Sequence, residues 1–339
     1  MYSAKLVMAS AIWLSVGSTY TQAQEGQLIG ESNPVWFDWS DVGSVPTAMP
    51  QFASGMLILP HRAGHSDPQF SLYSRDARLV GHVRVDIPEA GRTAVLGLAP
   101  LRNGFVVSAM AISGSERVGV LCFLDAAGKL RKIVKTEPFT PDLITVAADG
   151  SIWTFGAVDH ENDPTSTANV LYHFTETGEL LRSALPRNLF GKEPPTYLST
   201  ELGQPVLTSA GSRVVLYSPH TRQLFELALD GRVLGSYVIP LPNQQIRGKT
   251  ATDPMKMMGL ALTESGAIYG DLTGGENSGI YELDRSGQNW LPISPDVKEK
   301  VGNYLLLGGD GEDLVLGPTG PRNTDIEVHR IRLRSRFVQ

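Results

Sequence analysis

The chain has 339 residues and a formal net charge of -6 at pH 7, with 42% hydrophobic and 19% charged residues. This composition supplies a full hydrophobic core and excludes a disordered, collagen-like or disulfide-rich protein. Nucleic acids attract clustered cations, so the acidic balance and the lack of any Lys/Arg-rich run predict that nucleic acid is not a partner.

Residues 1–23 have the pattern of a secretory signal peptide. Lys5 provides the positive charge near the N-terminus, and an apolar stretch follows and ends at Val16. Small residues occupy positions 21 and 23, the third and the first before Gln24. The apolar stretch is about half as long as the roughly 20 residues that a membrane-spanning helix needs. We therefore predict cleavage before Gln24 and an exported protein, periplasmic or secreted. The mature chain, residues 24–339, is expected to form one domain without a transmembrane segment.

An internal repeat organises the rest of the chain. In five copies, an apolar residue is followed seven positions later by Gly or Ala and then by a second apolar run. The copies begin at Phe70, Leu121, Leu171, Leu224 and Ile280, and a sixth half-copy covers Ile326–Leu333. Regularly spaced units of this kind are typical of repeat architectures, in which each unit packs on its neighbours.

A second turn precedes each copy. A small or polar residue stands before Gly55, Gly104, Gly150, Gly211, Gly266 and Gly311, and a strand-like run follows each pair. Asn-Gly or Asp-Gly between apolar runs is a strong hairpin signal. Two hairpins in each of six units predict an all-β fold, a six-bladed β-propeller of four-stranded antiparallel blades. An open two-sheet sandwich, the alternative, would not require six equivalent copies.

The sixth copy lacks a fourth strand, because only residues 334–339 follow its third. Residues 27–40, which contain Trp36, Phe37 and Trp39, are the available candidate. We expect this N-terminal segment to complete the last blade and so close the ring without a disulfide.

Cys122 is the only cysteine, and it lies in the apolar run Val118–Leu124. A lone thiol in an apolar strand usually behaves as a small hydrophobic residue. We predict that Cys122 is a core residue rather than a nucleophile or redox sensor.

The units Ile144–Thr154 and Leu171–Arg182 resemble those of exported bacterial six-bladed propellers related to NHL-repeat and TolB-like domains, and the resemblance covers residues 50–333. The segment Asp149–Trp153 is also similar to the repeat of streptogramin-lyase-type propellers. These motifs specify strands and turns, so the resemblance implies a scaffold, and function has to be argued from the site.

One face of the expected propeller gathers the connections between second and third strands and between blades, and this loop-rich face is where we predict the site. Its first cluster is Asp159, His160, Glu161 and Asp163. Closely spaced carboxylates could supply part of the oxygen shell of a divalent cation such as Ca²⁺, the candidate cofactor. The segment lacks the EF-hand pattern, and a solvated acidic turn is the alternative.

Three further loops complete the predicted ligand-binding set. His61, His65 and Asp67 could bind Zn²⁺, but their spacing matches no zinc motif. His220 and Glu276 lie on two other loops of the same face.

The connection 244–258 combines three methionines with Arg247, Lys249 and Lys256. Flexible thioethers suit an adaptable surface for an anionic or peptide ligand. The alternative is that the methionines close the mouth of the channel as core residues.

These observations favour an exported, monomeric binding or interaction module whose partner is a protein, a peptide or a glycan. The alternative is a metal-dependent lactonase-type hydrolase or a lyase on the same scaffold. No Gly-x-Ser-x-Gly nucleophile elbow occurs in the sequence, and its serines, histidines and aspartates are too scattered to indicate a triad.

Overall fold

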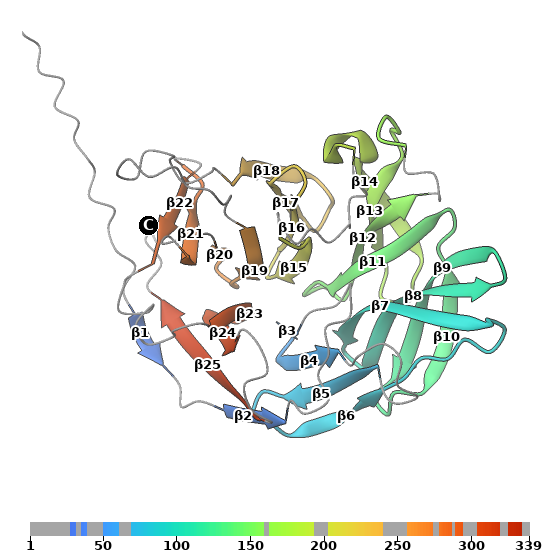
Figure 1. The fold of residues 1–339 in the computed structure, drawn as a ribbon, viewed down its shortest axis with the longest axis horizontal. Helices are drawn as coiled ribbons and strands as arrows, with labels where there is room; N and C mark the ends of the chain where they lie inside the picture. Colours follow the sequence, from blue (N-terminus) through green and yellow to red (C-terminus); the bar gives the residue numbers. More distant parts are fainter. Residues whose placement is uncertain are drawn as a thin grey trace, which may run out of the picture.

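Six antiparallel sheets stand around a central channel, as the sequence predicts (Figure 1). The computed structural model describes residues 28–31, 35–38, 50–60, 69–158, 163–192, 203–239, 256–273, 278–286, 289–293, 304–318 and 325–333. In each of the first five blades the strands follow one another outward from the channel in chain order. The six-bladed β-propeller is therefore confirmed.

The first three blades are built from consecutive strands. Blade 1 contains β3 (Gln51–Ala53), β4 (Met56–Pro60), β5 (Phe70–Ser74) and β6 (Leu79–Val83). Blade 2 contains β7 (Arg92–Leu101), β8 (Gly104–Ser113), β9 (Glu116–Asp125) and β10 (Leu130–Lys135). Blade 3 contains β11 (Phe139–Val146), β12 (Ile152–Val158), β13 (Asn169–Phe174) and β14 (Leu180–Pro186), which leads into the 3₁₀ turn η1 (Arg187–Phe190).

The last three blades continue the ring. Blade 4 contains β15 (Val206–Ala210), β16 (Arg213–Ser218), β17 (Gln223–Ala228) and β18 (Val233–Val238). Blade 5 contains β19 (Lys256–Leu262), β20 (Ile268–Thr273), β21 (Gly279–Asp284) and β22 (Asn289–Pro292). Blade 6 contains β23 (Tyr304–Asp310), β24 (Asp313–Pro318), β25 (Asp325–Leu333) and the N-terminal strands β1 (Leu28–Glu31) and β2 (Val35–Asp38).

The N-terminus closes the ring in two pieces rather than one. β1 pairs with the end of β25, where Leu28 faces Leu333, and β2 pairs with its beginning, where Val35 faces Val328. The two short strands lie along the outer side of β25 (Figure 1). The first and last described segments of the chain thus share one sheet, and no disulfide joins them, since the sequence has only one cysteine.

The repeated glycines stand in turns that need positive φ. Gly178, in the turn between β13 and β14, has φ of 86°, and Gly231 has φ of 80° in the equivalent turn of blade 4. Only glycine adopts this backbone region without a steric penalty. The spacing that predicted the blades therefore reflects the backbone geometry of their turns.

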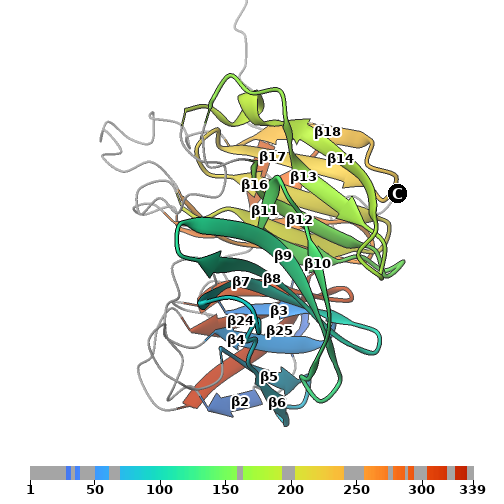
Figure 2. The ribbon, with the colours of Figure 1, turned by 90° about the vertical axis from the view of Figure 1, so that its right-hand side faces the viewer.

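Blade 2 has a tight connection between its second and third strands. β8 and β9 each run for ten residues and leave only a two-residue turn between them. The strand β9 extends along the whole blade in the side view (Figure 2).

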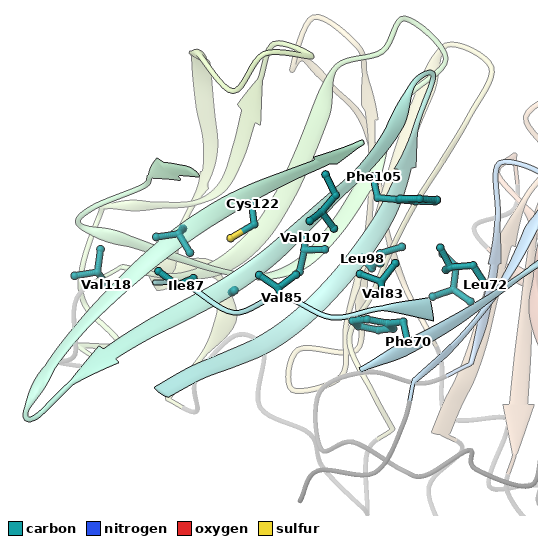
Figure 3. Close-up of a cluster of buried hydrophobic side chains, with 14 residues drawn as sticks. Phe70, Leu72, Val83, Val85, Ile87, Leu98, Phe105, Val107, Val118 and Cys122 are labelled. Atoms are coloured by element: carbon teal, nitrogen blue, oxygen red, sulfur yellow. The ribbon is translucent and has the colours of Figure 1, made fainter. Parts of the chain in front are cut away.

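The core lies between the blades. Between blades 1 and 2, Phe70, Leu98 and Val107 are buried together with Cys122, which is fully enclosed (Figure 3). Burial raises the pKa of the Cys122 thiol to about 12. Cys122 is thus a core residue, as predicted.

Hydrogen bonds also join neighbouring blades at the channel wall. The Gln51 amide donates to the carbonyl of Leu98 at 3.0 Å, which ties blade 1 to blade 2. The Gln204 amide donates to the carbonyl of Met258 at 2.7 Å and ties the start of blade 4 to blade 5. These bonds satisfy edge groups of the inner strands and hold the ring in register.

An ion-pair network ties blade 4 to blade 5. Glu226 on β17 is 1% exposed and pairs with Arg213 on β16 and with Arg285 of blade 5. The Arg285 nitrogens lie 2.9 Å from both carboxylate oxygens, a bidentate arrangement. Burial acts to raise the pKa of Glu226, but the hydrogen bonds and charges of Arg285 and Arg213 outweigh it and lower the pKa.

A second network ties blade 6 to blade 1. The Asp310 carboxylate accepts from Arg75 of blade 1 at 2.7 Å and from Arg330 of β25 at 3.0 Å. The Arg330 guanidinium also lies over the ring of Phe52, 5.3 Å from its centroid.

In the part of the chain that the structure describes, no helix has the length and apolar character to cross a membrane.

Candidate functional site

The loop-rich face carries the ends of the second strands and the beginnings of the inner strands, while the glycine turns lie on the opposite face. Of the residues predicted for the site, the structure describes Asp163 in blade 3 and His220 in blade 4. The other predicted residues lie outside the described ranges: His61, His65, Asp67, Asp159, His160, Glu161 and Glu276. The predicted signal peptide, residues 1–23, also lies outside them.

Asp163 is exposed and organises a turn at the base of the loop that precedes β13. Its carboxylate accepts hydrogen bonds from the Thr165 amide at 2.9 Å and from the Thr165 hydroxyl at 2.7 Å. These two bonds lower the pKa of Asp163, and the charge of Arg187 adds to the effect. Asp163 is therefore an anion fixed in orientation at the edge of blade 3.

Arg187 is a residue that the sequence did not indicate. It begins η1, is 4% exposed, and donates to the carbonyls of Gly191 at 2.7 Å and Lys192 at 3.2 Å. Burial lowers its pKa, while the charge of Asp163 acts in the opposite direction. Arg187 thereby fixes the turn that follows blade 3, next to the anion of Asp163.

The same turn packs on blade 4. Phe190 of η1 is fully buried and lies 5.2 Å from Phe155 of blade 3 and 5.6 Å from Phe225 of blade 4, measured between ring centroids. One apolar cluster around Phe190 therefore joins blade 3, which carries Asp163, to blade 4.

His220 lies in a four-residue turn between β16 and β17, which joins the paired residues Ser218 and Gln223. Arg222 closes the turn with φ of 55°, a left-handed conformation that is costly for any residue with a Cβ. Among the described residues, the buried hydroxyls of Ser218 and Thr221 have no hydrogen-bond partner. Sequence patterns report neither feature, because backbone strain and missing partners depend on the folded environment.

The inner strands enclose a cavity of about 110 Å³ along the channel. Polar residues on its wall are Gln51, Ser54, Asp142, Thr145, Gln204 and Thr208. This volume accommodates several water molecules but is well below the roughly 300 Å³ of a pocket for a drug-sized ligand. A larger ligand would therefore have to bind at the mouth of the channel, among the loops.

The methionine-rich connection is described only from Lys256 onward. Met257 is fully buried in the cluster between blades 4 and 5, and Met258 lines the channel. For these two methionines the structure supports the core alternative rather than an adaptable surface.

No protein-family model matches the chain, and no curated protein matches it in sequence. Solved structures do match its fold. A Bacteroides fragilis protein that carries the name of an exported protein aligns with a TM-score of 0.53 at 9% identity, over 93% of this chain and 97% of that one. A DUF4221 family member from Bacteroides vulgatus aligns with a TM-score of 0.53 at 12% identity, over 93% and 100%.

Virginiamycin B lyase from Staphylococcus aureus aligns over 91% of this chain and 100% of its own, with a TM-score of 0.43 at 14% identity. The two Bacteroides alignments, both with a TM-score above 0.5, show a shared fold and no function.

Proposed function

We propose that the protein is an exported propeller that binds a peptide, protein or glycan partner on the loop-rich face of blades 3 and 4. The observation that carries this proposal is the turn Ser218–Arg222, where two buried hydroxyls without a partner among the described residues and a left-handed arginine lie close together in the chain. The signal-peptide pattern supports export, as does the name of the Bacteroides fragilis protein.

The costs in this turn are of two kinds. A buried hydroxyl without a partner costs about 1–3 kcal/mol, and the turn contains two, on Ser218 and Thr221. The left-handed conformation of Arg222 costs at least about 1 kcal/mol. Glycine at this position would remove the backbone strain, whereas the arginine, which also interacts within the protein, places a cation in this turn of the loop-rich face.

The surrounding residues suit a partner with polar groups. Arg222 and His220 are hydrogen-bond donors on blade 4, and Asp163 supplies a fixed anion on blade 3. Because Phe190 packs between Phe155 and Phe225, one rigid apolar base supports both sets of groups. A partner that spans the two blades would meet the oriented carboxylate of Asp163 and the side chains of His220 and Arg222.

Binding to a glycan array and to a phage-displayed peptide library tests the proposal, with the purified wild-type protein as bait. The variants R222G and H220A should weaken a recovered ligand at least tenfold. The matched control is A77G, which relieves the same kind of strain (φ of 63°) in a turn on the opposite face. A77G should bind like the wild type.

The free energy of unfolding separates binding from folding. R222G should be as stable as the wild type or more stable by up to about 1 kcal/mol, because glycine relieves the strain. Unchanged binding by R222G and H220A would overturn the site, and a wild-type protein that recovers no peptide or glycan would eliminate these partner classes.

A further inference from the structure

The third strands of blades 2 to 4 carry equivalent side chains two residues before the turn to the fourth strand: Phe123, His173 and Glu226. Two of them contact the next blade directly. Phe123 packs against Gly178 of blade 3, where an added Cβ would lie 2.8 Å from the ring, and Glu226 binds Arg285 of blade 5. In blade 3 this position between blades belongs to His173.

His173 is buried without a hydrogen-bond partner. Its side chain is 4% exposed, and neither Nδ1 nor Nε2 has a partner within the described part of the chain. The ring stacks on Trp153, its cross-strand neighbour, with centroids 4.1 Å apart and an angle of 13° between planes. A neutral imidazole is tolerated here far better than an imidazolium, because the cation would bury a charge and two unsatisfied N–H donors.

The charged groups of blade 3 do not cancel the preference of His173 for its neutral form. The Asp149 carboxylate accepts from the Ser151 amide at 3.0 Å and from its hydroxyl at 2.6 Å. Arg182 is the cross-strand neighbour of His173 on β14. Burial is the main cause that lowers the pKa of His173, Asp149 partly opposes it, and Arg182 lowers it further.

Blade 4 presents its turn Ala228–Arg232 to the same region. Gly231 of this turn packs on the Arg182 chain, where an added Cβ would lie 2.6 Å from Cδ. The charged residues of the turn, Asp230 and Arg232, are exposed and pair with each other at 3.8 Å. Glu226 meets an arginine of the following blade, whereas at the equivalent position the structure shows no acidic residue of blade 4 paired with His173 among the described residues.

We propose that His173 is an acid-sensitive latch between blades 3 and 4, which holds them together while neutral and releases them when it takes up a proton from the solvent. Release frees β13 and β14 from the turn Ala228–Arg232. Because Phe190 of η1 belongs to the apolar cluster between the same blades, release would also reach the loop-rich face, a consequence that rests on the proposed function.

Amide hydrogen exchange, followed by mass spectrometry, tests the latch on the free protein. Wild type is compared with H173F, which keeps an aromatic ring against Trp153. Both proteins are measured at each of several pH values from 8 to 5, and comparison at equal pH removes the effect of pH on the intrinsic exchange rates. The control is H82F, because His82 is an exposed residue of β6 that contacts Ser71. Wild type and H82F should lose protection in β13, β14 and residues 228–232 as the pH falls, whereas H173F should keep it.

Two outcomes would overturn the latch: equal loss of protection in H173F and wild type, or full protection of these segments in the wild type at pH 5. If H173F does not fold, histidine NMR of the wild type provides the readout. The His173 ring should titrate below its ordinary pKa of 6.5, together with the loss of protection, and titration at or above that value refutes the latch. No ligand is used, so failure here leaves the proposed binding function to its own test.

Discussion

Replacing Asp271 with Asn should stabilise the protein at neutral pH and much less in acid. Asp271 on β20 is 3% exposed, and its carboxylate accepts one long hydrogen bond, 3.4 Å from the amide of Leu306 in blade 6. Burial raises its pKa from the ordinary 3.8 to about 6, partly opposed by that hydrogen bond. Asn resembles the protonated acid in shape and can still accept from Leu306.

The magnitude follows from the two pKa values. A group with a raised pKa contributes stability that is fully present below pH 3.8 and is lost as the pH rises through 6. Ionisation of Asp271 therefore costs the fold about 3 kcal/mol at pH 7. D271N should recover this amount at pH 7.5, equivalent to roughly 5 °C in Tm for a chain of this size, and about half of it at pH 5.

Urea unfolding of wild type and D271N at pH 5 and pH 7.5 measures the effect. The matched control is D86N, because Asp86 is 69% exposed and pairs with Arg84 at the surface. Its free energy of unfolding should change by less than about 0.5 kcal/mol. A D271N variant that is no more stable at pH 7.5, or whose gain is the same at both pH values, would refute the reasoning.

Three further predictions concern the core, the blade 4–5 contact and the ring closure. Cys122 should not react with a thiol reagent such as DTNB in the native protein at pH 8 but should react fully in urea, and stoichiometric native labelling would contradict its burial. E226Q should lower the free energy of unfolding by about 3–5 kcal/mol, since it removes the partner of two arginines, whereas the exposed control E264Q should change it little in the same urea titration. Removal of residues 24–40 should leave β25 as an open edge and cause self-association in size-exclusion chromatography, and addition of the same segment as a peptide should restore the monomer; a stable monomer without the segment would contradict its role in closure.

The fold could be predicted from the sequence because its signals are local. A turn such as that at Gly178 needs positive φ, so glycine recurs wherever the chain reverses between strands. Counting the strands of each unit predicted that an N-terminal segment completes blade 6. The sequence did not show that two separate strands, β1 and β2, would pair with β25.

The contacts between blades could not be predicted in the same way. Glu226 and Arg285 are 59 residues apart, and no local pattern connects them. Strand alternation is also interrupted by bulges, such as the one between Met257 and Gly259, so a period of two does not tell which blade a side chain faces. Hence the burial of Asp271 and His173, and the strain of Arg222, emerged only from the structure.

The sharing of blade 6 between the two ends of the chain also has a consequence for the order of folding. β1 is synthesised first, yet its partner β25 lies roughly 300 residues later, so this sheet is the last that can be completed. Closing a loop of that length costs only about 1.7 kcal/mol more entropy than closing one of roughly 45 residues, the span of a single blade. The equilibrium cost is thus modest, but the delay leaves the outer edge of β25 exposed until the N-terminal strands arrive. That interval is when a folding chain is most open to pairing with a neighbour.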